Sequence, residues 1–163
     1  FVKEYEKEGL GGHVLIKAAD ESIDRRMPRM DSEYSMGYQL TMELLREQKQ
    51  FTAIAGQNDM MAIGAIDALE KSRIRVPKDV SVIGCDDIFY SSIRRLSLTT
   101  IDHFVALKGR DACDIIIRKI TTNDQFYTGL QPTSLYNIEY TPKLIARKTT
   151  TYAKTSGISK PVK

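Results

Sequence analysis

The chain has 163 residues and a mass of 18.5 kDa, which is enough for one domain or for one lobe and part of another. A hydrophobic share of 42% and a charged share of 28% are ordinary for a globular protein and exclude the disordered class, and no apolar run is long enough to span a membrane. The net charge of +3 comes from residues 143–163, which hold six of the 24 basic residues and no acidic one; the 18 basic and 21 acidic residues over residues 1–142 argue against a nucleic-acid-binding face there.

The N-terminal part predicts two helices separated by a strand and a loop. The first nine residues are acidic and amphipathic, which indicates a short helix ending at Gly9 rather than a signal peptide. They lack an initiator Met, so we expect a piece of a longer protein. Residues 13–16 are a candidate strand, and residues 17–31 are charged and without period, as in a loop. Ser32 can cap a helix whose apolar stripe runs from Met36 to Leu45.

Strands and a helix alternate in the middle of the chain. Residues 51–55 and 80–84 are short apolar runs typical of buried strands. Asn58 can cap the helix between them, whose apolar stripe is Met61, Ala65, Ala68 and Leu69, and Pro77 prevents the helix from continuing. Alternation with short connections predicts an α/β fold, a parallel sheet with helices on both faces.

Beyond residue 100 the pattern is less regular. Residues 105–120 predict a helix with one apolar face, and residues 136–140 alternate like an edge strand. A last apolar patch covers residues 144–146. Polar residues without period dominate from Thr149 onward, and we expect residues 151–163 to be a disordered or loosely attached basic tail.

Candidate site residues follow from the rule that ligands of such sheets bind at the carboxyl ends of the strands. Asn58 follows the first strand of the middle unit, Asp86 and Asp87 follow the second, and Asp31 with Ser32 enters a helix. These side chains could bind a polyol or a heterocycle through hydrogen bonds. Each also has a plain alternative, because Asn58 and Ser32 could act only as helix caps and the aspartate pair could be an acidic turn.

Catalytic patterns are weak, so we expect no enzyme, no cofactor and no metal site. His13 and His103 lack ligand spacing to a cysteine or an acidic cluster, and no phosphate-binding glycine loop or nucleophile elbow is present. Cys85 and Cys113 are too few for a disulfide framework and predict reduced core thiols in a cytoplasmic protein. Asp86 and Asp87 could be a phosphoacceptor-type acidic pair, but the further acidic residue and the lysine that this chemistry needs are not evident.

Several runs resemble the effector-binding domain of the LacI/GalR family of bacterial transcriptional regulators. They are NDMMAIGAIDAL (58–69), IRVPKDVSVIG (74–84), the Asp86–Asp87 pair, LTTI (98–101) and LIARKTT (144–150), with the pairs Asp31–Ser32 and Gly37–Tyr38 in the matching order. The resemblance covers about residues 1–150. It implies the type I periplasmic-binding-protein-like fold, here mainly the C-terminal lobe from residues 1–101 and about 135–148, with a segment of the N-terminal lobe over about 104–132.

The resemblance also implies partners and roles. A small sugar or a nucleoside- or purine-like effector would bind between the lobes, the protein would be a homodimer, and operator DNA would be bound by a helix-turn-helix head outside this chain. Asn58 and Asp86 match polar residues that line the family's cleft, and His103 falls where a side chain can reach the ligand. Ser32 stands where many members have a stacking aromatic residue. The helix over residues 58–69 is a candidate dimer surface, although its stripe could simply be core.

Two alternatives to a regulator remain open. A solute-binding receptor for sugar transport or chemotaxis would share the fold without binding DNA, and a secretory signal upstream would favour it. An enzyme using Asp86 and Asp87 would require metal-dependent labelling of Asp86 by a phosphodonor.

Overall fold

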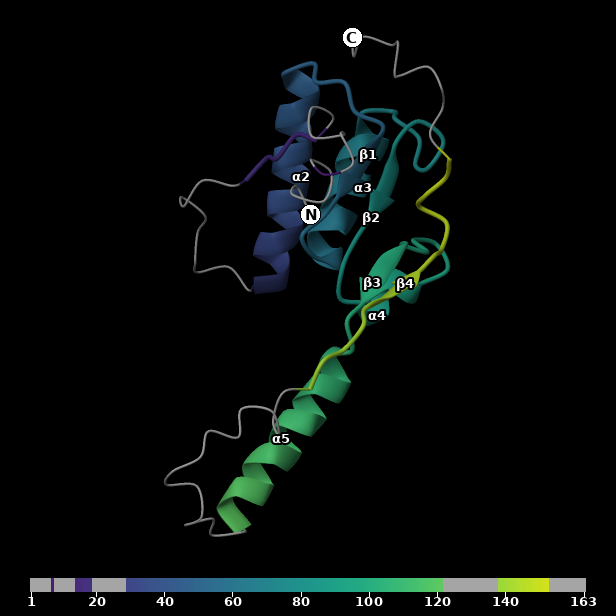
Figure 1. Ribbon diagram of the computed structural model, residues 1–163. Coiled ribbons are helices and arrows are strands. Elements are labelled where there is room, and N and C mark those ends of the chain that lie inside the picture. Colours follow the sequence, from purple (N-terminus) through teal and green to yellow (C-terminus); the bar gives the residue numbers. More distant parts are fainter. Residues whose placement is uncertain (1–6, 8–13, 19–28, 122–137, 153–163) are drawn as a thin grey trace.

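The computed structural model describes residues 7, 14–18, 29–121 and 138–152. The helices are α2 (Arg29–Arg46), α3 (Asp59–Lys71), α4 (Phe89–Ser92) and α5 (Val105–Thr121), and the strands are β1 (Ala53–Ala55), β2 (Ser81–Ile83), β3 (Thr100–Asp102) and β4 (Lys143–Ile145) (Figure 1). The predicted helix ending at Gly9 and most of the tail lie outside the described residues.

The strands form a parallel arrangement with an antiparallel edge. β1 pairs with β2 in parallel, with Ala53 opposite Ser81, and a parallel bridge between Ile83 and Thr99 joins β2 to the chain entering β3. β4 pairs with β3 in the antiparallel sense. Because strand, helix and strand follow one another with short connections, the predicted α/β class with a parallel sheet is confirmed.

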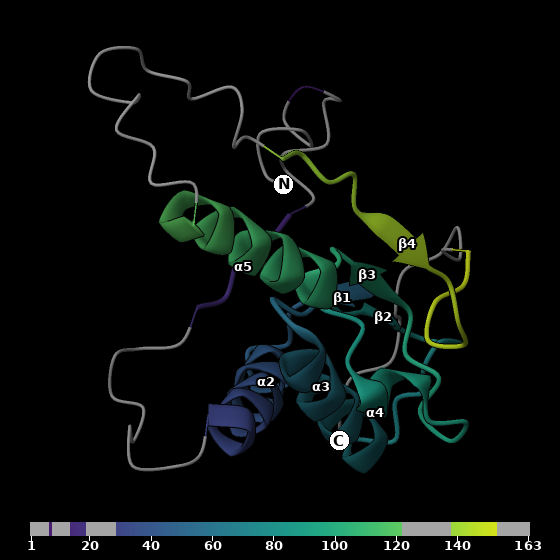
Figure 2. The same cartoon turned by 90° about the horizontal axis from the view of Figure 1, so that it is seen from below.

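The core lies between α3 and the sheet. Its buried residues are Ala62, Ile66, Leu69, Val80, Val82 and Leu98, to which α3, β2 and the strand-entry residues contribute. α3 contacts both β1 and β2, and α2 packs on α3, so these two helices lie together beside the sheet (Figure 2). Ala65, Ala68 and Leu69 of the predicted stripe are buried. Their side of α3 is therefore core and is not available as a dimer surface.

Helices α2 and α3 cross with their backbones in close contact. A Cβ atom added at Gly64 would lie 2.0 Å from the carbonyl oxygen of Tyr34, and one added at Gly37 would lie 2.0 Å from that of Met61. The two glycines thus allow an approach that no larger residue permits. Across the same contact the Tyr34 hydroxyl donates to Asp67 Oδ2 at 2.5 Å.

This hydrogen bond makes the helix contact sensitive to alkaline pH. The Asp67 carboxylate, and secondarily burial, raise the pKa of Tyr34 to about 12 from its ordinary 10.0. Because the bond needs the phenol proton, its contribution to stability is complete below about pH 10 and is lost as the pH rises toward 12. Tyrosinate absorbance can be titrated in the wild type and in Tyr34→Phe, and the difference should show one group that ionises near pH 12. Asp67→Asn should lower the pKa of this group. A difference curve centred near pH 10 would contradict the assignment.

Three local predictions are wrong in their details. Ser32 does not cap α2, because the helix already begins at Arg29. Residues 14–16 form no strand, and both Leu15 and Ile16 are exposed, since no described strand lies beside them to pair with. In the C-terminal part, residues 138–140 are not in a strand, and the edge strand is β4, because the residues that reach β3 are Lys143–Ile145.

The polar segment that begins at Thr149 is attached to the sheet. The Thr149 carbonyl accepts a hydrogen bond from the Val82 amide at 2.7 Å, and its hydroxyl donates to the Val82 carbonyl at 2.7 Å. The Thr151 amide donates to Ser81 Oγ at 3.1 Å. Low hydrophobicity suggested a loose segment, but backbone and hydroxyl hydrogen bonds to a strand need no apolar side chains. Residues 153–163 lie outside the described part.

Helix α5 extends away from the sheet (Figure 1). None of its residues is buried, and its apolar residues Ile116, Ile117 and Ile120 are more than half exposed. The predicted amphipathic helix is confirmed, while its assignment to a second lobe over residues 104–132 stays a prediction. Among the described residues, no helix combines the length and the apolar character needed to cross a membrane.

Candidate functional site

The carboxyl ends of β1, β2 and β3 meet at one edge of the sheet. The Gly56 amide donates to the Ile83 carbonyl at 2.9 Å, and the Asp59 amide donates to the Cys85 carbonyl at 2.8 Å. The Asp86 amide donates to the Ile101 carbonyl at 2.9 Å. Backbone hydrogen bonds therefore hold the three connections that follow these strands against one another, as the strand-end rule predicts.

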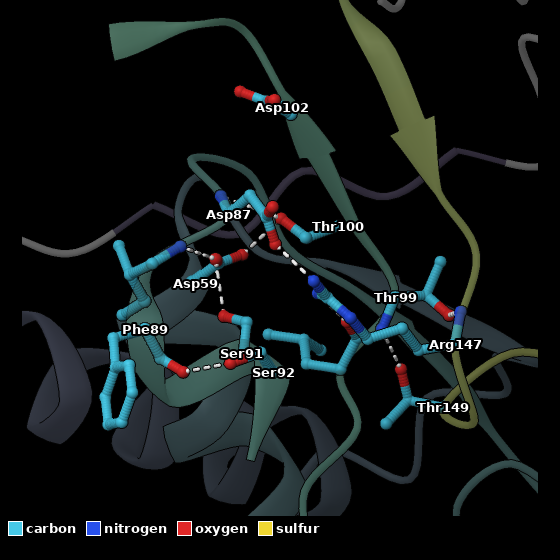
Figure 3. A network of polar contacts seen from close by, with 12 residues as sticks. Asp59, Asp87, Phe89, Ser91, Ser92, Thr99, Thr100, Asp102, Arg147 and Thr149 are labelled. Atoms are coloured by element: carbon cyan, nitrogen blue, oxygen red, sulfur yellow. Dashed lines mark hydrogen bonds and ion pairs between the residues drawn. The ribbon is translucent and has the colours of Figure 1, made fainter. Parts of the chain in front are cut away.

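Asp59 organises the interior of this edge. Its side chain is fully buried and accepts hydrogen bonds from the Ile88 amide at 2.9 Å, the Ser91 hydroxyl at 2.6 Å and the Thr100 hydroxyl at 2.5 Å (Figure 3). A Cβ atom at Gly84 would lie 2.1 Å from Asp59 Oδ1, so this position has no room for a side chain. Asp59 thus joins α3, α4 and β3, and its role is structural.

The two aspartates after β2 point to different partners. Both have a positive φ, 114° for Asp86 and 49° for Asp87, which is a strained backbone for residues other than glycine. Asp87 accepts from Arg147 at 2.6 Å, and Arg147 also donates to the Leu98 carbonyl at 2.9 Å (Figure 3). Arg147 therefore links the C-terminal segment to the turn, and its ion pair uses the Asp87 carboxylate.

Asp86 belongs to a chain of polar contacts that sequence reasoning did not find. His103 Nε2 lies 2.8 Å from Asp86 Oδ1, and Lys108 Nζ lies 3.1 Å from His103 Nδ1. Because an ammonium group can only donate, Nδ1 accepts from Lys108, and Nε2 carries the proton that is donated to Asp86. The side chains of His103 and Asp86 are 30% and 35% exposed, so both can be reached from solvent. A lysine therefore does lie near Asp86, reached through His103.

Asn58 acts as the predicted helix cap. Its Oδ1 accepts from the Met61 amide at 2.9 Å, and its backbone is extended, as an N-cap requires. The structure shows no hydrogen bond from the Asn58 amide nitrogen to another described residue. Capping thus uses the oxygen of this side chain, and the NH₂ group remains as a donor at the edge.

Among the described residues, the structure shows no hydrogen bond between Ser32 and another candidate site residue. It lies in the first turns of α2. Because α2 leads into β1 as α3 leads into β2, the first turns of both helices lie at the carboxyl edge. Ser32 is therefore at the predicted end of the fold, and its contact with a ligand stays a prediction. His13 lies outside the described residues.

Cys85 is half-buried beside these groups. Burial, followed by the negative charges of Asp86 and Asp59, raises the pKa of the Cys85 thiol above its ordinary value. Its sulfur, an Asp86 oxygen and a His103 ring nitrogen lie within 4.8 Å of one another. The spacing of His103 along the chain gave no sign of this cluster, because it is β3 that returns the histidine to the turn after β2. Cys113 is exposed, which corrects its prediction as a core thiol.

Three residues of the site carried no usable sequence signal. Lys108 lies 22 positions after Asp86 in the chain, and Arg147 lies 60 positions after its partner Asp87. Asp59 looked like an ordinary acidic residue in the first turn of a helix. Asp59 differs from such residues only in its position around the helix axis, which turns its side chain toward the sheet.

The comparisons with known proteins agree with the α/β fold. The family described as the periplasmic binding protein-like domain matches residues 1–150. A transcriptional repressor PurR of Haemophilus influenzae is 43% identical over 112 residues, covering 69% of this chain and 32% of the repressor. An arabinose metabolism transcriptional repressor of Halalkalibacterium halodurans is 38% identical and covers 67% of this chain and 28% of its own length. The chain spans about a third of the length of these relatives.

Solved structures give the same family. A LacI-family regulatory protein of Corynebacterium glutamicum matches with a TM-score of 0.56 and 34% identity, covering 72% of this chain and 42% of that one. The Lac repressor bound to ONPG matches with a TM-score of 0.57 and 31% identity, covering 72% of this chain and 33% of the repressor. A LacI-family regulator of Arthrobacter in complex with lactose matches with a TM-score of 0.59 and 26% identity, covering 72% and 42%. This chain therefore belongs to the periplasmic binding protein-like domain family, in the effector-binding form carried by LacI/GalR-type transcriptional regulators.

Proposed function

We propose that this chain is the ligand-sensing, dimerising part of a LacI/GalR-type transcriptional regulator that acts in the cytoplasm. It binds a small sugar or a nucleoside-like effector, and the effector controls the binding of operator DNA by a helix-turn-helix head elsewhere in the protein. The matched relatives are repressors, and a matched LacI-family regulator is seen with lactose, which supports a binding role over an enzymatic one.

The observation that carries this proposal is the pair Asp86 and His103 at the carboxyl edge of the sheet. Both side chains are about one-third exposed, and the amide nitrogen of Asn58 follows the neighbouring strand. The pair supplies a carboxylate that can accept from two hydroxyls, while Asn58 supplies a donor. Such a set suits a polyol or a ring with both donors and acceptors, and it lies on strand ends held by backbone hydrogen bonds.

The mechanism follows from where these residues lie relative to α5. Lys108 in α5 contacts His103, so a ligand that engages His103 and Asp86 also acts on the segment that leaves this lobe. A ligand held between the lobes favours the lobe arrangement that it binds more tightly. In a homodimer that shift changes how two DNA-binding heads are presented, with coupling limited to the difference in affinity between the two states.

A thermal-shift screen of sugars, nucleosides and purines on the full-length protein tests the binding site. A ligand at about 100 times its dissociation constant should add roughly 2.7 kcal/mol of stability. Asp86→Ala should weaken a hit about 10- to 100-fold, because a hydrogen bond to a charged group is lost. Asn58→Ser keeps an oxygen for the helix cap but removes the amide donor. We expect it to weaken ligand binding less than Asp86→Ala does.

Asp79→Asn is the matched control, because Asp79 precedes β2 and lies at the opposite edge of the sheet, paired with Arg75 at 2.6 Å. A hit that Asp86→Ala and Asn58→Ser leave unchanged would mean that the effector binds elsewhere. Any ligand found in the screen can also be used to distinguish a regulator from a solute receptor. Added to the full-length protein bound to DNA selected from a random pool, it should change the DNA affinity, whereas a receptor would select no DNA.

A further inference from the structure

Three metal-ligating side chains of different kinds meet at the turn after β2. The Cys85 sulfur, an Asp86 carboxylate oxygen and a His103 ring nitrogen lie within 4.8 Å of one another, and all three residues are partly buried. Cys85 and Asp86 are adjacent in the turn, and His103 follows β3 directly. Neither the fold nor the proposed effector requires this combination of sulfur, oxygen and nitrogen.

The backbone beneath this cluster is held on both sides. The Cys85 carbonyl accepts from the Asp59 amide at 2.8 Å, and the Asp86 amide donates to the Ile101 carbonyl at 2.9 Å, two residues before His103. An ion about 2.0–2.3 Å from three tetrahedral ligands needs donor atoms about 3.4 Å apart. His103 Nε2 and Asp86 Oδ1 are 2.8 Å apart, and all three donor atoms lie within 4.8 Å of one another, so the present spacing brackets this value.

We propose that Cys85, Asp86 and His103 form a binding site for a zinc-class divalent ion. One thiolate, one imidazole and one carboxylate suit a borderline ion such as Zn²⁺ better than the hard ions Mg²⁺ or Ca²⁺, which prefer oxygen alone. Three protein ligands leave a fourth position for water or for a ligand oxygen. The cluster lies at the same carboxyl edge as the proposed effector site, with which it shares Asp86 and His103.

Charge and protons balance in a simple way. Zn²⁺ takes the Asp86 carboxylate and the Cys85 thiolate, the thiol proton goes to solvent, and the imidazole moves its proton from Nε2 to Nδ1. The ion then neutralises two negative groups beside the buried Asp59. The proton release predicts that binding acidifies a weakly buffered solution.

Lys108 opposes the ion in the present arrangement. With metal on Nε2, the protonated Nδ1 would face the Lys108 ammonium, two donors at 3.1 Å, so the lysine must move away. Lys108 also lies over the Tyr140 ring, 5.6 Å from its centroid, which offers the displaced ammonium a second contact. Metal binding and the contact of α5 with His103 therefore compete.

Titration of the chelator-washed, tag-free, reduced full-length protein with Zn²⁺, and with Co²⁺ as a spectroscopic probe, tests the site. We expect one equivalent to bind with a thiolate-to-cobalt charge-transfer band. Cys85→Ser should abolish the band, and His103→Ala should lower the Zn²⁺ affinity by more than the roughly 10- to 100-fold that loss of an outer partner costs. Lys108→Gln should raise the affinity, because the ammonium that faces His103 Nδ1 is removed.

Cys113→Ser is the matched control, since Cys113 is exposed on α5, and it should keep both the band and the affinity. Circular dichroism of Cys85→Ser should match the wild type, so that loss of the band reports the ligand and not the fold. A band that survives in Cys85→Ser, or a Zn²⁺ affinity unchanged in His103→Ala, would overturn the site. The result is independent of the proposed regulatory function, because the metal alone is the probe.

Discussion

Replacement of Asp59 by alanine should lower the free energy of unfolding by about 4 kcal/mol, a large part of what a domain of this size has. The fully buried carboxylate accepts from the Ile88 amide and from the Ser91 and Thr100 hydroxyls. Alanine leaves these three donors without an acceptor in a dry interior, and each such group costs about 1–3 kcal/mol. Urea denaturation followed by circular dichroism measures the loss.

Asp59→Asn sharpens this test, because it keeps the shape and one acceptor oxygen while placing an NH₂ group against donors. The free energy of unfolding of Asp59→Asn should lie between that of the wild type and that of Asp59→Ala. Asp79→Asn is the less buried counterpart, and because the partner Arg75 is exposed, breaking this pair should cost no more than about 1 kcal/mol. If Asp59→Ala is no more harmful than Asp79→Asn, then the Asp59 hydrogen bonds do not hold this edge of the sheet together.

The Gly64→Ala variant is expected to lose about 3 kcal/mol, although alanine is normally the better helix former. The added Cβ would lie 2.0 Å from the Tyr34 carbonyl oxygen and 2.9 Å from the Tyr38 amide nitrogen. These are backbone atoms of α2, so the contact can be relieved only by moving one helix away from the other. The separation would also lengthen the bond between Tyr34 and Asp67. Thermal or urea unfolding measures the change.

Gly109→Ala provides the opposite expectation from the same substitution. Gly109 lies within α5, and an added Cβ would meet nothing within 4 Å. The variant should be neutral or gain up to about 1 kcal/mol, because alanine restricts the unfolded chain and favours the helix. A loss in Gly109→Ala as large as that in Gly64→Ala would show that steric contact between α2 and α3 is not the cause.

Much of the fold follows from patterns that are local in the sequence. Apolar runs before Gly56 and Gly84, with an amphipathic helix between them, predicted β1, α3 and β2, and Asn58 caps α3 as its residue type suggested. Wrong predictions came where a strand needs a partner, at residues 14–16 and 138–140. A strand is stabilised by its neighbours, so a short alternating or apolar run does not by itself form one.

The candidate site was predicted only in outline. The strand-end rule placed Asn58 and Asp86 at one edge, and the family resemblance added His103. The structure brings Asp86 and His103 into contact. The rule could not place Lys108. It also could not distinguish Asp86 from Asp87, since the two positive φ angles of the turn send their side chains to different partners.

The sequence by itself determined the alternation of strands and helices, the capping of α3, the family and the edge where polar residues gather. Periodicity, caps and strand ends are properties of short stretches, so they can be read without a partner segment. Only the tertiary structure decided that Asp59 is a buried hub, that Arg147 fastens Asp87, and that Cys85, Asp86 and His103 form one cluster. These contacts join residues that are far apart in the chain, and their geometry depends on how β3 and the C-terminal segment return to the sheet.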